Sequence, residues 1–304
     1  MRWQSVLLVF LNIILIFALI IYWLNPGGDM SFDFNQGYNS NFSASNNTVQ
    51  MQFYENMRFP APEISYSIDD LCSLKRKNSM TEAFAILENY TILSFYPVSK
   101  NPEITVSCQN RQMVEDGLFI AGEGGPTNIT DANQYKIIWS GEILLIKDTE
   151  CERPNVAVHE LLHVLGFEHS DNENNILYPV SKCRQVIGTD IPDLINKLYS
   201  IPGLPDLKFV NASAEINGRS LSVNFSVRNE GLSESSDAKI KIFTEDKVVE
   251  DIDLKPLSVG QGVKIELSNI WLSKTKIEEL GIVIESDFDE LSHDNNQVLL
   301  VKTN

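Results

Sequence analysis

The sequence predicts an α+β domain (an α/β-type twisted sheet plus helices), followed by an all-β immunoglobulin-like sandwich and preceded by an N-terminal transmembrane helix. Two observations predict the two folded domains. Helical and strand patterns are mixed up to about residue 200, whereas hydrophobic residues alternate with a period of two from residue 207 onward. Residues 201–206, IPGLPD, form a proline- and glycine-containing linker between them. With 304 residues, 43% of them hydrophobic, the chain can build two cores.

The N-terminal segment is almost wholly apolar from residue 5 to residue 24. A helix of this length spans about 30 Å, the thickness of a hydrocarbon core. Arg2 is the flanking positive charge, so the positive-inside rule places everything after residue 25 outside the cell. We therefore predict a signal anchor over residues 1–25 in a single-pass protein of the cell membrane. A cleaved signal peptide, which would make the protein secreted, is disfavoured because no small-x-small site follows.

Residues 26–58 are rich in Asn, Ser and Gly and are predicted to form a flexible tether. The scattered Phe and Tyr residues offer an alternative, in which this segment packs onto the next domain. Six sequons indicate a glycoprotein or, equally, only an Asn-rich composition. Their asparagines are Asn41, Asn46, Asn89, Asn128, Asn211 and Asn224.

The first domain is predicted to cover residues 59–200. Its expected elements are a strand at 64–68, an amphipathic helix at 78–93, a strand at 103–108, two strands within 135–147 meeting at Ser140-Gly141, and a final helix at 189–199 capped by Thr189. The core face of the first helix is expected to hold Ala83, Phe84, Leu87 and Leu93. Residues 117–128 are glycine-rich and predict a turn or a loop at the edge of a cleft, because they lack the context of a phosphate-binding loop.

The stretch from residue 159 to 169, HELLHVLGFEH, contains three of the four histidines. His159 and His163 are one helical turn apart, so their rings project from one face and can share a zinc ion. Gly166 is placed to end the helix in a left-handed turn, which can bring His169 back as a third ligand. Three protein ligands leave one coordination position for water, as in catalytic zinc sites.

Glu160 lies about 100° around the helix from His159 and can reach a water on the metal without binding the metal itself. The expected chemistry is deprotonation of this water by Glu160, as general base, for attack on a polarised carbonyl. The alternative, helix histidines without a metal, requires the five matched positions to arise by chance.

This stretch resembles the metzincin signature H-E-x-x-H-x-x-G-x-x-H, and residues 156–170 resemble the matrixins, the matrix-metalloprotease family. Downstream, Ile176-Leu177-Tyr178-Pro179 is similar to the L-M-Y-P turn of the matrixins, and residues 189–199 are similar to their last helix. The resemblance implies a metzincin fold and a zinc metalloendopeptidase acting on extracellular proteins. It also implies that an edge strand, residues 142–146 or its neighbour, binds the substrate by β-augmentation.

Three departures from the matrixin pattern are visible. Leu177 replaces the methionine that forms an apolar floor under the zinc, a change that nearly conserves volume, so we expect activity to survive. The second, structural zinc site and the calcium loops are not matched; calcium at Asp171 and Glu173 is possible but unsupported, because their spacing favours a solvated turn. No cysteine precedes Cys72, so no cysteine-switch propeptide is expected.

The cysteines lie in the exported part of the chain and are even in number, which indicates disulfides. They are Cys72, Cys108, Cys151 and Cys183. Three pairings are possible. We favour Cys72–Cys108 and Cys151–Cys183, the second of which would brace the zinc site.

Residues 207–304 predict about seven short strands and no helix, the pattern of an immunoglobulin-like sandwich. The stretches VRNEGLSES and DNNQV resemble the CARDB module, a cell-adhesion-related domain, which implies binding of a surface protein or glycan. Its late acidic cluster is expected to form an exposed hairpin loop rather than an ion site. This cluster is Asp287, Asp289, Glu290 and Asp294, with His293.

The charge balance is acidic, with 24 basic against 41 acidic residues and a net charge of −17, which disfavours nucleic acid and anionic lipid as partners. We expect a membrane-anchored, outward-facing zinc endopeptidase whose substrate is a protein or peptide, with Glu160 catalytic and His159, His163 and His169 as metal ligands. The alternative is a surface binding or adhesion protein with a degenerate zinc domain. A non-peptidase zinc hydrolase is disfavoured by the extended-substrate architecture that the resemblance implies.

Overall fold

The structure is a computed structural model that describes residues 39–44, 50–110, 114–115, 118–119, 121–148, 151–245, 247–275 and 277–301. The signal anchor predicted over residues 1–25 lies outside the described residues. Within the described ranges, no helix combines the length and the apolarity needed to span a membrane.

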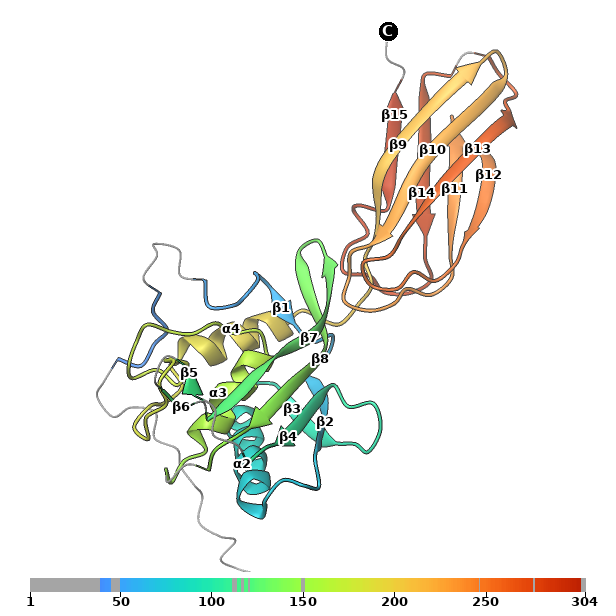
Figure 1. Cartoon of the computed structure of the whole chain (residues 1–304). Coiled ribbons are helices and arrows are strands. Elements are labelled where there is room, and N and C mark those ends of the chain that lie inside the picture. Colours follow the sequence, from blue (N-terminus) through green and yellow to red (C-terminus); the bar gives the residue numbers. More distant parts are fainter. Residues whose placement is uncertain are drawn as a thin grey trace, which may run out of the picture. The chain divides into compact units, whose positions relative to one another are not determined.

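The upstream domain is built on a mixed sheet with strand order β1-β8-β4-β2-β3, and β7 also pairs with β8 (Figure 1). The strands are β1 (Met57–Arg58), β2 (Glu63–Ile68), β3 (Ser94–Pro97), β4 (Ile104–Cys108), β7 (Gly122–Ala132) and β8 (Tyr135–Leu145); β5 (Val114–Glu115) and β6 (Leu118–Phe119) form a separate ribbon. Neighbouring strands run parallel except β7, which is antiparallel to β8. Since β8 is the one described strand that β7 pairs with, β7 has a free edge.

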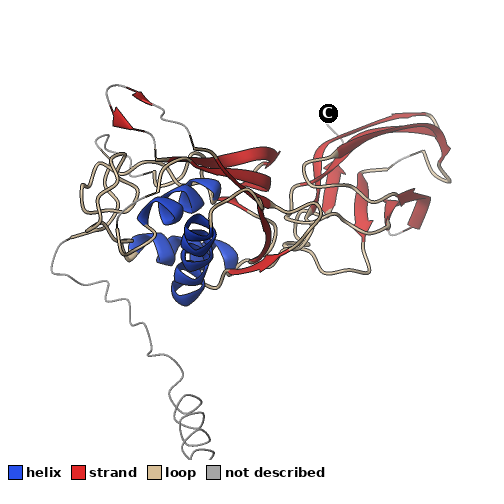
Figure 2. Cartoon of the chain, turned by 60° about the horizontal axis from the view of Figure 1, so that its bottom comes forward, coloured by secondary structure: helices blue, strands red, loops and turns tan. Residues whose placement is uncertain are grey.

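The described helices of this domain gather beside the sheet (Figure 2). They are α2 (Leu74–Tyr90), α3 (Asn155–Val164) and α4 (Asp190–Tyr199). The helix α2 begins four residues before the prediction, because Ser73 Oγ caps it by accepting a hydrogen bond from Arg76 N. Ala83, Phe84 and Leu87 are buried as expected, whereas Leu93 is buried just after the helix. Thr189 precedes α4 but makes no side-chain cap hydrogen bond.

One loop prediction and one strand prediction in this domain are wrong. The glycine-rich stretch 117–128 is not only a loop, because β7 begins at Gly122. Residues 135–145 form the single strand β8 instead of two strands, because Gly141 continues the ladder opposite Ile104 and Pro126. A Cβ at Gly141 would lie 2.5 Å from Val164 Cγ1, so this glycine permits close packing on α3 and does not make a turn.

Both favoured disulfides are present. Cys72 bonds to Cys108 and Cys151 bonds to Cys183. The second disulfide joins the segment before α3 to the segment that follows the Leu177 turn. Their presence supports the prediction of an extracellular protein.

The downstream domain is a sandwich of two antiparallel sheets (Figure 1). One sheet has the order β13-β10-β9 and the other β12-β11-β14-β15. The strands are β9 (Leu207–Asn217), β10 (Ser220–Asn229), β11 (Ala238–Thr244), β12 (Lys247–Leu254), β13 (Gly262–Trp271), β14 (Glu279–Glu285) and β15 (Gln297–Val301). The core takes alternate residues of β10, which are Leu221, Val223, Phe225 and Val227, as their period of two predicts.

The acidic cluster of the sandwich is exposed as expected, except for Glu290. The Glu290 carboxylate is buried and accepts hydrogen bonds from Leu207 N, Ser286 Oγ and Asn296 Nδ2. Glu290 is therefore a structural acceptor that holds the start of β9, not part of an exposed loop.

Five of the six sequon asparagines fall on described residues, and all five are exposed: Asn41, Asn89, Asn128, Asn211 and Asn224. Asn46 lies outside the described residues. Glycosylation of these sites stays a prediction.

Candidate active site

Helix α3 presents the first two histidines of the motif on one face. The helix stops before Gly166, whose φ of +92° is the left-handed conformation that the sequence predicts there. Gly166 N donates to His163 O, and Phe167 N donates to Leu162 O, which satisfies carbonyls at the helix end. The chain then returns so that His169 faces the helix.

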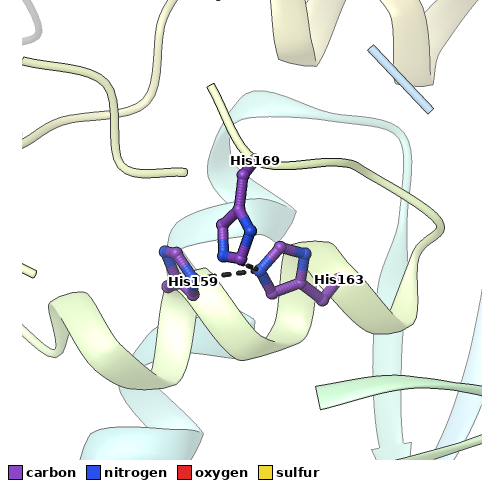
Figure 3. A group of neighbouring side chains, drawn as sticks. All are labelled: His159, His163 and His169. Carbon is purple, nitrogen blue, oxygen red and sulfur yellow. Dashed lines mark hydrogen bonds between the residues drawn. The ribbon is translucent and has the colours of Figure 1, made fainter. Parts of the chain in front are cut away.

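The three histidine side chains converge, as Figure 3 shows. His163 Nε2 lies 2.9 Å from His159 Nε2 and 3.1 Å from His169 Nε2. Their ligand atoms all lie within 4.8 Å of one another, and no other group of three His, Cys, Asp or Glu residues in the described ranges is arranged in this way.

Backbone carbonyls fix two of the rings. His159 Nδ1 is 2.7 Å from Ile176 O, and His163 Nδ1 is 2.7 Å from Phe167 O. Because a carbonyl only accepts, each Nδ1 carries the proton and each Nε2 keeps its lone pair. Two lone pairs facing each other at 2.9 Å repel unless a cation lies between them. The donor set therefore fits a metal ion, and imidazole nitrogens with carbonyl-oriented rings suit zinc.

Burial keeps these imidazoles neutral and available as ligands. The pKa of His159 is lowered to about 4 and that of His163 to about 3; burial is the largest cause of both decreases, and the neighbouring histidines contribute to them. Burial also lowers the pKa of His169. A neutral imidazole can donate its lone pair to a metal without first losing a proton.

Glu160 follows His159 on α3 and is only 5% exposed. Burial, and secondarily the negative charge of Glu123, raises the pKa of Glu160 to about 8. A carboxyl group with this pKa can take up a proton and return it near neutral pH.

The edge strand β7 passes directly over Glu160. A Cβ on Gly122 would lie 2.8 Å from Glu160 Oε1, and one on Gly124 would lie 2.9 Å from Glu160 Cα. Glycine is therefore required at Gly124, where a Cβ would meet the backbone of α3, whereas a Cβ at Gly122 would displace the Glu160 side chain. The sequence revealed the glycines, but not that their strand covers the active-site helix.

The turn that contains Leu177 lies under the histidines. Leu177 is fully buried, Leu177 O accepts from Ser170 N at 3.0 Å, and the neighbouring Ile176 O meets His159. The adjoining Asp171 and Glu173 lie in a solvated turn, as their spacing favours, because Glu173 pairs with Lys182 Nζ at 2.6 Å and Asp171 is exposed.

The described parts of the predicted tether pack on the loop that carries His169, which favours the alternative interpretation of this segment. Upstream of His169, Phe53 N donates to Gly166 O and Glu168 N donates to Met51 O. Downstream, Asp171 N donates to Ser43 O at 2.7 Å.

Phe42 anchors the first part of this segment. Its side chain is only 7% exposed, and its backbone N donates to Asp190 Oδ2 at 2.6 Å. Residues 39–44 and 50–53 thus hold the His169 loop from both sides. The sequence signal for this role is the presence of aromatic residues in an Asn-rich stretch.

Comparison with known proteins agrees with this geometry. The matrixin peptidase family matches residues 24–200, and the CARDB family matches residues 204–299. No curated protein matches the chain. Solved structures that are similar include a CARDB domain of Pyrococcus furiosus in complex with di-metal ions, with 12% identity over 32% of this chain and 84% of that chain and a TM-score of 0.28.

Two further solved structures also align. High choriolytic enzyme 1, a hatching enzyme zinc-protease from the medaka fish Oryzias latipes, has 18% identity over 36% of this chain and 46% of that chain, with a TM-score of 0.24. Myroilysin has 18% identity over 37% of this chain and 52% of that chain, with a TM-score of 0.27.

The mixed sheet, the helix with its histidine triad and the returning loop define a metzincin-like metalloprotease domain. Because the family match covers more than half of the chain, the chain belongs to the matrixins, and its matrixin domain is followed by a CARDB domain.

Proposed function

We propose that this matrixin is a zinc-dependent endopeptidase that cleaves extended segments of extracellular proteins, with His159, His163 and His169 as metal ligands and Glu160 as general base. The observation that supports this most directly is the convergence of three imidazoles beside a buried carboxyl group. A zinc ion bound there would supply Lewis acidity that acidifies a water molecule and polarises the scissile carbonyl.

Glu160 then accepts the proton of this water and returns it to the leaving amine. The free edge of β7 offers backbone groups to an extended peptide, which would lie next to Glu160 because Gly122 and Gly124 bring the strand there. Leu177 supplies an apolar floor. In this proposal, residues 1–25 anchor the enzyme in the cell membrane, and the CARDB domain binds a surface protein or glycan.

The test compares the wild type with Glu160→Gln, using zinc content and cleavage of an unfolded protein with and without a chelator. We expect one zinc per chain in both proteins, internal cleavage by the wild type that the chelator abolishes, and a loss of at least about 100-fold in the variant. Full activity of Glu160→Gln would overturn the assignment of the base. Zinc without any cleavage by the wild type would instead favour a binding or adhesion protein.

A further inference from the structure

A cavity of about 290 Å³ lies beside the histidine triad and is lined by three segments of the chain. Its lining residues are Phe53, Tyr54, Met57, Pro126, Ile129 and Glu168. Five of these are apolar or aromatic, and Glu168 is the only charged one. Met57 is buried, whereas Tyr54 is 54% exposed and Ile129 is 39% exposed, so the cavity has an apolar base and an accessible rim.

The cavity adjoins both the catalytic residues and the peptide-binding edge. The Phe53 ring stacks on His163 with 6.0 Å between centroids, and Glu168 precedes His169 in the chain. On the other side, Pro126 and Ile129 belong to β7, two and five residues beyond Gly124. An extended peptide aligned with β7 advances about 3.3 Å per residue, in step with the strand. The substrate side chain that reaches the cavity would therefore belong to a residue roughly two to five positions from the scissile bond.

The lining suits a long cationic side chain. Aromatic faces and Met57 can cover the aliphatic stem of Lys or Arg, and a carboxylate at the rim can pair with its charged end. No ion pair of the Glu168 side chain is present among the described residues, so its carboxylate is available for such a partner. An acidic side chain would meet Glu168 with like charge.

We propose that this cavity is a substrate subsite that selects Lys or Arg at one position two to five residues from the scissile bond. The proposal rests on the proposed peptidase function and deepens it by naming a substrate class. Glu168 and Tyr54 determine the specificity, and they act on substrate selection without taking part in the chemical step.

The experiment profiles cleavage sites of the zinc-loaded full chain on a random peptide library, by mass spectrometry. The wild type should show Lys and Arg enriched at one position in this range. Glu168→Gln should reduce the enrichment of Lys and Arg about fivefold, and Tyr54→Ala should reduce it about two- to fivefold. Glu168→Lys should reverse the preference, so that Asp and Glu are enriched at this position instead. The matched control is Glu63→Gln, because Glu63 is an exposed carboxylate on β2, away from the edge strand.

The outcomes separate this inference from the proposed function. Absence of cleavage by the zinc-loaded wild type would overturn the peptidase proposal itself. Cleavage with no basic preference, with an apolar preference only, or with a basic preference unchanged in Glu168→Gln, would overturn the subsite while leaving the peptidase intact. Zinc content of every variant is measured in parallel, so that a metal site damaged by a substitution next to His169 is recognised. If the Glu168 variants lose zinc, the effect of Tyr54→Ala on the basic preference decides whether the cavity is the subsite.

Discussion

Removal of the Cys151–Cys183 disulfide is expected to weaken both the fold and the zinc site. The closed segment spans 32 residues and contains α3, all three histidines and the Leu177 turn. In the chain-entropy treatment, a loop of this length lowers the free energy of the folded state relative to the unfolded state by about 3.7 kcal/mol. The double substitution Cys151→Ser/Cys183→Ser should therefore lower the free energy of unfolding by about that amount.

The other disulfide provides a matched control. Cys72–Cys108 closes a segment of 36 residues, for which the same treatment gives about 3.8 kcal/mol, but this segment contains no zinc ligand. Both double serine variants should lose similar stability in urea unfolding of the metal-free protein. Only Cys151→Ser/Cys183→Ser should also lose zinc affinity, by about tenfold or more in competition with a chelator, because the supports of the ligands become mobile.

Two results would refute this reasoning. Equal losses of zinc affinity in the two variants would mean that the Cys151–Cys183 ring has no special relation to the metal site. Unchanged zinc affinity after removal of Cys151–Cys183 would mean that the backbone bonds to the histidine rings suffice to hold them.

Three further predictions concern individual side chains. Gly124→Ala should cost about 1–3 kcal/mol of stability, because the new Cβ meets the backbone of α3, whereas Gly125→Ala, with open space at its Cβ, should melt near the wild-type temperature in calorimetry. Arg58→Ala should cost at least about 2 kcal/mol in urea unfolding, since the buried guanidinium donates to four backbone carbonyls; wild-type stability would contradict its structural role. In the metal-free protein, the Glu160 pKa rises from 4.5 unfolded to about 8 folded, so the folded state binds an extra proton between these values and stability should fall as pH rises from about 5 to 8. Glu160→Gln should remove this slope in a pH series of unfolding, and an unchanged slope would assign it to another group.

The active site could be predicted from sequence because its geometry is local. A helical turn fixes the relation between His159 and His163, and Gly166 fixes the reversal that returns His169. The sandwich could also be predicted from the sequence, because the alternation of apolar and polar residues along β10 indicates which residues face the core.

What the sequence did not predict depends on contacts between distant segments. From the sequence alone, Gly122 is predicted to lie in a loop and Gly141 in a turn. The structure shows that Gly122 packs against Glu160 of α3 and that Gly141 packs against Val164. The hydrogen bonds that Ser43, Met51 and Phe53 make to the backbone of the His169 loop join main-chain atoms, and such bonds are not specified by residue type.

The docking of residues 39–44 and 50–53 has a consequence for the kinetics of metal exchange. Because the His169 loop is held from both sides, its ordering entropy is lost when the protein folds and not when the metal binds. A bound ion can leave readily only when this loop opens, and opening breaks the hydrogen bonds of the Phe53 and Asp171 amides. Hydrogen exchange at those two amides should then proceed at a rate that sets an upper limit on the rate of metal release.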